Sequence, residues 1–195
     1  MPISNREENP LKTQDTGSLS CYLREWTDEY SFNEDKNFVD LKHKFEANLV
    51  LMIRHLANEI NSKIDLLPMH SFHFGGDDRL FARKIKKIID AESEAIPNNY
   101  LSQETRIYLR PLSPKEILDN MMNARLNVCM RFHSVLFAET LGVPYLAIDY
   151  TRGGKIYAFL NEKQKLNRLF DLEEIAQGLW KERLSNSFIH DLIGI

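Results

Sequence analysis

The stretch Leu126–Asp149, LNVCMRFHSVLFAETLGVPYLAID, contains the pattern that decides the fold of this chain. Residues 126–130 and 145–149 are short apolar runs of strand length, and residues 134–141 between them read as a helix. A Gly-Val-Pro sequence at 142–144 turns the chain from this helix into the second run. A strand, a helix and a second strand in this order are typical of a parallel α/β sheet.

The same alternation of apolar runs and helical patterns extends over the chain from Gly17 onward. Ser113 and Glu116 have the spacing of a capping box around Pro114, which is a strong signal for the start of a helix. We therefore predict a Rossmann-like parallel sheet of five or more strands with helices on both faces. The expected strands are 18–23, 64–69, 106–110, 126–130 and 145–149, and the expected helices are 38–60, one beginning at Asp77 or Asp78, 114–124, 134–141 and 171–184.

The composition is that of an ordinary soluble globular protein, with 43% apolar and 27% charged residues in a chain of 195. This length favours one domain, which we place at 17–195, after a polar tail at 1–16 that contains two prolines. The net charge of −3 gives no general attraction to nucleic acid or to an anionic membrane, so we expect neither as a partner. No apolar run is long enough for a membrane span, and the polar, acidic residues 1–8 do not resemble a secretory signal. We therefore expect a cytoplasmic protein.

The two cysteines, Cys21 and Cys129, each lie within an expected strand. We predict that they are buried, reduced thiols, as is usual for a cytoplasmic protein. A disulfide between them would require the two strands to be neighbours.

Several basic residues directly follow the expected strands. Ligands of open parallel sheets bind outside the carboxyl ends of the strands, so these positions are candidates for a site. The helix from Ser134 onward would add free backbone N–H groups and a dipole that favour an anion. The sequence therefore predicts a small site for a highly charged anion. The candidates are Arg24 after the first strand, His70 and His73 after the second, Arg131 and His133 after the fourth, and Lys155 after the fifth.

Each of these residues also has a simpler interpretation. Arg24 could be a solvated or salt-bridged surface residue, as most arginines are. Lys155 follows Gly153-Gly154 and could belong to a flexible polar loop, and His133 could be a core histidine with satisfied hydrogen bonds. Their coincidence at strand ends is what favours a shared site.

Two segments together resemble the polysaccharide pyruvyl transferase family. Ala124–Ala138 contains an Arg-x-His-Ser turn from strand to helix, and the Gly-Val-Pro turn leads into an apolar strand that ends in Tyr150, with Lys155 shortly after. The resemblance covers about residues 17–159 and implies the fold of the carboxyl-terminal lobe of a two-lobed, glycosyltransferase-B-like (GT-B-like) protein. Further elements similar to the family are Leu23-Arg24-Glu25-Trp26, Leu67-Pro68-Met69 and Asp77-Asp78.

The resemblance implies an enzyme, a transferase that moves a pyruvyl group from phosphoenolpyruvate onto two sugar hydroxyls of a polysaccharide as a cyclic ketal. Phosphate is released in this reaction. The chain would supply the lobe that binds phosphoenolpyruvate, which is a substrate, and no cofactor is implied. The expected partners are a sugar acceptor and an amino-terminal lobe or a second copy of the chain in a homo-oligomer.

The resemblance also implies roles for individual residues. Arg24 and Lys155 would hold the carboxylate and phosphate of the donor, Arg131 would assist them or brace the turn, and Ser134 would contribute at the helix start. His133 would be the general acid or base, because ketal formation needs a proton on the enol carbon and removes one from a hydroxyl. Orientation of the ligand without proton transfer is the alternative role for His133.

The supporting residues have two interpretations each. Asp77 and Asp78 either cap a helix, which we favour, or orient His133 or the sugar. Trp26 and Tyr150 either stack on a sugar face at the rim of the site or belong to an interface between lobes.

A metal site is a weaker hypothesis. His70, His73 and Asp77 could act as ligands, but two histidines on an irregular segment with no cysteine nearby are a poor signal. We therefore predict no metal.

Two other functions stay open from the sequence. The first is the sugar-nucleotide-binding lobe of a GT-B glycosyltransferase or epimerase, in which Glu139, just before Gly142, would contact the ribose. The second is a non-catalytic remnant that serves as an interaction module through the face that a missing lobe would cover.

Overall fold

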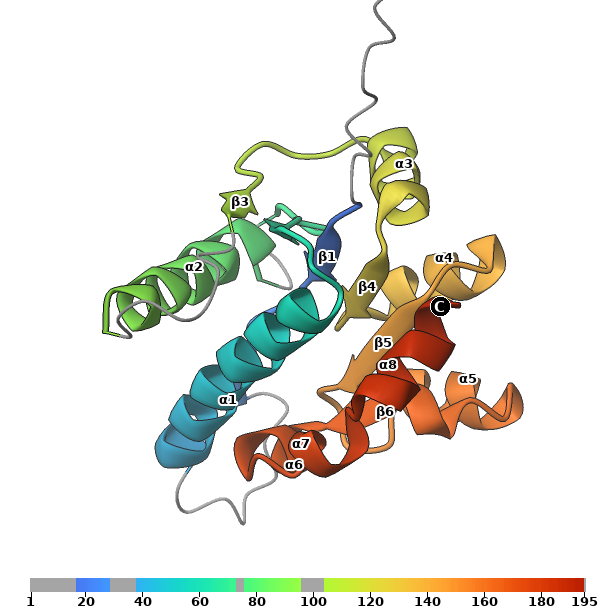
Figure 1. Cartoon of the computed structure of the whole chain (residues 1–195). Coiled ribbons are helices and arrows are strands. Elements are labelled where there is room, and N and C mark those ends of the chain that lie inside the picture. Colours follow the sequence, from blue (N-terminus) through green and yellow to red (C-terminus); the bar gives the residue numbers. More distant parts are fainter. Residues whose placement is uncertain (1–16, 29–37, 73–75, 96–103, 195) are drawn as a thin grey trace, which may run out of the picture.

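The structure, a computed structural model, describes residues 17–28, 38–72, 76–95 and 104–194 (Figure 1). The predicted tail at 1–16 lies outside these ranges. The described chain forms a parallel sheet of six strands in the order β3-β2-β1-β4-β5-β6, which confirms the predicted Rossmann-like class. The strands are β1 (Leu19–Tyr22), β2 (Ile64–Leu66), β3 (Thr105–Ile107), β4 (Leu126–Cys129), β5 (Tyr145–Asp149) and β6 (Leu169–Asp171).

Helices cover both faces of this sheet. They are α1 (Phe38–Glu59), α2 (Asp78–Ala95), α3 (Pro114–Asn123), α4 (Phe132–Leu141), α5 (Lys155–Glu162), α6 (Leu172–Ala176), α7 (Trp180–Arg183) and α8 (Asn186–Ile193). The buried side chains of α1, α2 and α6–α8 pack on one face, and those of α3, α4 and α5 pack on the other. No helix within the described ranges is long and apolar enough to cross a membrane.

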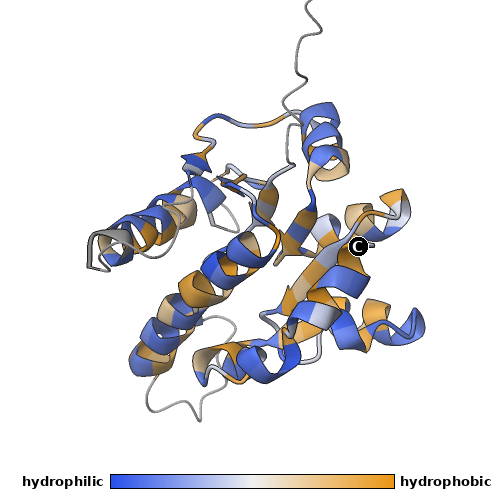
Figure 2. Ribbon diagram, viewed as in Figure 1, coloured by the Kyte–Doolittle hydropathy of each residue, from blue (hydrophilic) through white to orange (hydrophobic). Residues whose placement is uncertain are grey.

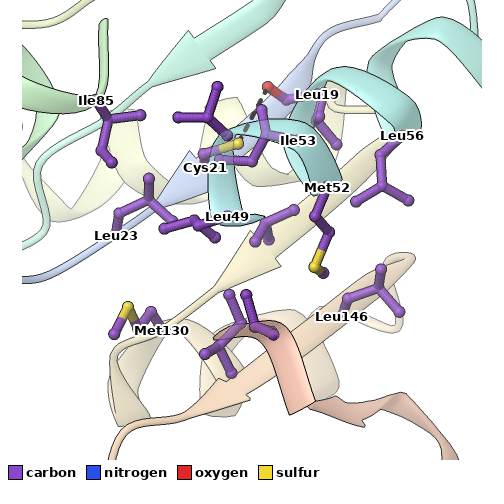
Figure 3. Close-up of a cluster of buried hydrophobic side chains, with 14 of the residues drawn as sticks. Leu19, Cys21, Leu23, Leu49, Met52, Ile53, Leu56, Ile85, Met130 and Leu146 are labelled. Atoms are coloured by element: carbon purple, nitrogen blue, oxygen red, sulfur yellow. Dashed lines mark hydrogen bonds between the residues drawn. The ribbon is translucent and has the colours of Figure 1, made fainter. Parts of the chain in front are cut away.

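The apolar stripe of α1 forms the centre of one hydrophobic layer. Leu49, Met52 and Ile53 are fully buried, and Figure 3 shows them close to Leu19 and Cys21 of β1. Apolar residues alternate with polar ones along this helix, as expected for a helix with one buried side (Figure 2). Burial of each large side chain contributes about 1.5–3 kcal/mol, so this stripe fixes α1 on the sheet.

Local signals in the sequence place the ends of α3 and α4. The Ser113 hydroxyl accepts a hydrogen bond from the Glu116 amide, and the Glu116 carboxylate accepts one from the Ser113 amide, which confirms the capping box. Gly142 ends α4 with a φ of 67°, a left-handed conformation that glycine adopts without strain.

The carboxyl-terminal region differs from the prediction of one helix at 171–184. Asp171 caps α6 by accepting a hydrogen bond from the Glu174 amide at 2.7 Å, but α6 ends at Ala176 and α7 begins at Trp180. Gly178 lies between them with a φ of 75°, which an α-helix cannot contain. The prediction of a continuous helix is therefore wrong. β6, α5 and α8 were not predicted.

The two cysteines are buried and free, as predicted. β1 and β4 are neighbours, but Cys21 pairs in register with Val128, whereas Cys129 pairs with Tyr22. This offset by one residue puts Cys21 in the hydrophobic layer of α1 and Cys129 in the layer on the opposite face. Burial raises the pKa of the Cys129 thiol to about 12, so both geometry and chemistry keep it unreactive.

Candidate active site

The strand order reverses between β1 and β4. The helices that follow these two strands in the described chain, α1 and α4, pack on opposite faces of the sheet. Open α/β sheets bind ligands at such a switch point. Arg24 follows β1, Arg131 follows β4, and Lys155 begins the helix after β5. Because all six strands are parallel, these three residues lie at the same carboxyl edge of the sheet.

The turn from β4 into α4 presents backbone N–H groups at this edge. The Arg131 carbonyl accepts the first hydrogen bonds of the helix, from the amides of Ser134 at 2.9 Å and Val135 at 3.2 Å. The amides of Phe132 and His133 precede these bonds and are therefore available to an external acceptor. Ser134 is fully buried, and its hydroxyl donates to the Arg131 carbonyl at 2.6 Å, so this side chain holds the turn and does not face a ligand.

Arg131 is bound to a buried carboxylate. Its Nε lies 3.0 Å from each oxygen of Asp78, its Nη2 donates to Oδ1 at 2.5 Å, and its side chain is 13% exposed. Asp78 also accepts hydrogen bonds from the amides of Met69 at 3.1 Å and His70 at 2.8 Å. This network joins the segment after β2, the start of α2 and the turn after β4. Of the two roles predicted for Arg131, the geometry fits the bracing of the turn.

Asp77 and Asp78 have separate partners. Asp77 accepts hydrogen bonds from the Arg79 amide and guanidinium, and the guanidinium holds the pKa of this carboxyl below its usual range. Asp77 therefore caps α2, as the sequence favoured, whereas Asp78 serves Arg131. No hydrogen bond joins either carboxylate to His133 within the described chain.

A hollow of about 320 Å³ opens beside the amino end of α4. Tyr150 forms part of its wall. Arg24 is 6% exposed as a residue, and its guanidinium lies 4.2 Å from the centre of the Tyr150 ring. Lys155 is exposed at the rim as the first residue of α5, so the loop interpretation of this residue is wrong. The described residues that line the hollow are Phe132, Tyr150, Thr151, Gly154, Lys155 and Ile156.

His133 is exposed in the first turn of α4, so it is not a core histidine. Its ring lies 6.0 Å from the ring of Phe132, which lines the hollow, and 6.4 Å from that of Phe137. An exposed imidazole beside the hollow is free to meet a ligand, and its catalytic role stays a prediction.

Trp26 is not at the rim. It is fully buried, with its ring 4.9 Å from that of Phe38 and 6.1 Å from that of Phe45. The prediction of a sugar or lobe contact for Trp26 is therefore wrong, because three- and four-residue periodicity in α1 places two phenylalanines over it. His73 lies outside the described residues, and the described chain contains no group of three possible metal ligands.

The loop after β5 was missed by sequence reasoning. Asp149 is buried, and its carboxylate accepts hydrogen bonds from the Thr151 amide and hydroxyl at 2.9 and 2.6 Å and from the Gly153 amide at 2.8 Å. Asp-x-Thr is a signal for such a turn, since a short carboxylate bonds to amides that follow it. The loop is thereby fixed, and it aims Tyr150 and Lys155 at the same hollow.

A doubly wound parallel sheet with cations and a helix amino terminus at its switch point defines an α/β domain suited to a small anion. The family model for polysaccharide pyruvyl transferase matches residues 5–152, more than half of the chain, and the chain belongs to this family. A search of the curated proteins gives no match. Among solved structures, the N-terminal domain of Candida albicans trehalose-6-phosphate phosphatase is similar, with a TM-score of 0.43 and 12% identity. The match covers 91% of this chain and 38% of that one.

Proposed function

We propose that this chain binds phosphoenolpyruvate and supplies the donor-binding lobe of a pyruvyl transferase. The observation that carries the proposal is the hollow formed by Tyr150, Lys155 and the start of α4, with Arg24 packed on Tyr150. Its volume of about 320 Å³ is at the lower end of the range for ligand sites and suits a small substrate.

Phosphoenolpyruvate carries a carboxylate and a phosphate close together, so it needs more than one fixed positive group. Lys155 offers a compact charge with three donors, and the amides of Phe132 and His133 offer the positive end of a helix dipole. Arg24 offers a guanidinium whose orientation is set by the Tyr150 ring. We assign Arg131 to the support of these groups, because its Nε and Nη2 already donate to Asp78 and its Nη2 also donates to the Gly76 carbonyl.

The reaction places a pyruvyl carbon between two hydroxyls of a sugar. The two hydroxyls lose two protons as the two C–O bonds form. One proton is gained by the enol carbon, and the other leaves with the phosphate as the bond between the pyruvyl carbon and the phosphate oxygen breaks. His133 is our candidate for one of these proton transfers, since an imidazole exchanges protons near neutral pH and this one is open to a ligand. The acceptor would be held against the bound donor by an amino-terminal lobe or a second copy of the chain.

The sugar-nucleotide alternative depended on Glu139. In the structure the Glu139 carboxylate accepts hydrogen bonds from the Tyr145 hydroxyl at 2.8 Å and from Lys165 at 2.6 Å. Tyr145 is the first residue of β5, so Glu139 lies at the amino edge of the sheet, opposite to the hollow. This placement favours the smaller donor over a nucleotide.

Titration calorimetry of the folded chain with phosphoenolpyruvate tests the proposal. We expect binding that is tighter than that of inorganic phosphate or of pyruvate, because only phosphoenolpyruvate presents both anionic groups. UDP and UDP-glucose serve as matched comparisons in a thermal-shift assay, since a ligand that binds the native state raises the melting temperature. The absence of heat at millimolar phosphoenolpyruvate, or a shift with UDP-glucose alone, would overturn it. A shift with UDP-glucose alone would favour the sugar-nucleotide-binding lobe, whereas a chain that binds neither ligand would favour a non-catalytic interaction module.

A further inference from the structure

A second hollow, of about 500 Å³, lies at the carboxyl ends of β5 and β6. Its lining includes Asp149 at the end of β5, Asp171 at the end of β6, and Arg152 and Tyr157 from the chain between them. It therefore lies on the same edge of the sheet as the proposed donor site, but on the other side of the loop at 149–154.

This loop separates the two hollows. Arg152 and Gly153 line the hollow at β6, whereas Thr151 and Gly154 line the hollow beside α4. The loop is held by the buried Asp149 carboxylate, so the two hollows keep a fixed relation to each other. A ligand in one hollow is thus one loop away from a ligand in the other.

The chemistry of the second hollow differs from that of the donor site. Four carboxylates and two guanidiniums line it, so it disfavours a second phosphate or a nucleotide. Lys155 is, in contrast, the one charged side chain among the described residues that line the hollow beside α4. The second hollow is therefore suited to a ligand without negative charge.

The polar and aromatic groups of this hollow match an uncharged sugar. Tyr157 is 42% exposed, so its ring offers an apolar face and its hydroxyl a polar tip. The Glu173 carboxylate is paired with the Arg152 guanidinium at 2.9 Å. A hydrogen-bond acceptor and a donor therefore lie side by side, an arrangement that suits two neighbouring hydroxyls of a sugar. Leu166 and Leu169 add apolar wall.

We propose that this hollow binds an uncharged sugar residue of the acceptor glycan, next to the residue that receives the pyruvyl group. The proposal rests on the proposed function, and it names a subsite for the acceptor on the same chain that binds the donor. Because the loop at 149–154 intervenes, the sugar in this hollow is a neighbour of the reacting sugar. Contacts to such a remote residue hold the reacting hydroxyls in position.

Saturation-transfer NMR on the full chain tests the subsite with the methyl glycosides of glucose, galactose and mannose. A monosaccharide buried in one hollow is expected to bind with a Kd on the order of millimolar. Tyr157→Ala should reduce the signal of the preferred glycoside about 3- to 10-fold, whereas Tyr157→Phe, which keeps the ring, should retain most of it. Phe72→Ala is the matched control, since Phe72 is an exposed aromatic residue at the β2 end of the same edge. Circular dichroism melts verify that each variant is folded.

A set of cross-tests separates this inference from the proposed function. Tyr157→Ala should leave phosphoenolpyruvate binding unchanged, and Lys155→Ala should leave glycoside binding unchanged. Three results would overturn the subsite: no saturation transfer to any glycoside, an equal loss of glycoside signal in Phe72→Ala, or displacement of the glycoside by phosphoenolpyruvate. If glycosides bind as expected but phosphoenolpyruvate does not, the proposed function fails, and with it the assignment of the sugar to an acceptor.

Discussion

Arg131 and Lys155 lie at the same edge of the sheet, but their charges are held in different ways. Arg131 is 13% exposed and makes a bidentate ion pair with buried Asp78. Lys155 is exposed, and no carboxylate pairs with it in the described part of the chain. A cation whose donors are occupied shapes the site, whereas one whose donors are open can bind a ligand. Two basic residues that follow strands at the same edge of the sheet therefore need not have the same role.

The largest effect on stability should come from the occupied cation. Asp78→Ala leaves a mostly buried guanidinium without its carboxylate and removes the acceptor for two backbone amides. We expect the free energy of unfolding to fall by about 3–5 kcal/mol, measured by urea denaturation. Asp77→Ala is the matched control and should cost about 1 kcal/mol, the usual value of a helix cap. Similar losses for the two variants would mean that the Arg131 pair is not a structural brace.

Replacement of His133 should affect catalysis and not stability, because this side chain is exposed beside the hollow. His133→Gln is expected to lower pyruvyl transfer about 10²- to 10⁴-fold, while phosphoenolpyruvate affinity changes only a few-fold. The amide still offers a hydrogen bond but cannot exchange a proton. Turnover is measured with the acceptor-binding lobe present, and affinity by calorimetry. Near-normal turnover of this variant would assign His133 a role in orientation alone.

The sequence predicted where the candidate residues lie better than what each of them contacts. Parallel strands bring the residues that follow them to one edge, so Arg24, Arg131, His133 and Lys155 could be placed from apolar runs alone. The ion pair of Arg131 could not be foreseen in this way, since Asp78 is 53 residues away and belongs to another strand-to-helix connection.

Local and tertiary signals also explain the differences in the fold. The capping box of α3 acts within four residues and was read correctly, whereas the break between α6 and α7 depends on the backbone conformation of Gly178. Trp26 follows Arg24 at the end of β1, and only the packing of α1 shows that its ring is covered. Burial of a large side chain near a strand end is set by elements that are distant in sequence.

The exposed cation should matter for binding and not for stability. Lys155→Ala is expected to weaken phosphoenolpyruvate binding by about 1.5–3 kcal/mol, the value of a lost charge-assisted hydrogen bond, with no change in unfolding. Arg24→Ala should weaken binding by a similar amount. Lys163→Ala, at the other end of α5, is the control and should bind normally. If Lys155→Ala and Lys163→Ala bind equally well, the open charge of Lys155 is not part of the site.

The smallest effect concerns the ion pair of Arg110 with Glu116, which is at the surface. This pair therefore measures what burial adds to the pair of Arg131 and Asp78. The hydrogen bonds from Arg110 and then from Ser113 lower the pKa of Glu116 to about 2 from an ordinary value of 4.5. A carboxyl with a lowered pKa in the folded state stabilises the protein above its unfolded pKa, and this contribution is lost as the pH falls from 4.5 to 2. The difference in unfolding free energy between the wild type and Glu116→Gln should therefore be constant above about pH 5 and shrink below it.

Solvent screens an exposed pair, so the loss of unfolding free energy in Glu116→Gln should be well below that in Asp78→Ala at every pH. A larger loss for Glu116→Gln than for Asp78→Ala at neutral pH would contradict the distinction between occupied, buried charges and open ones.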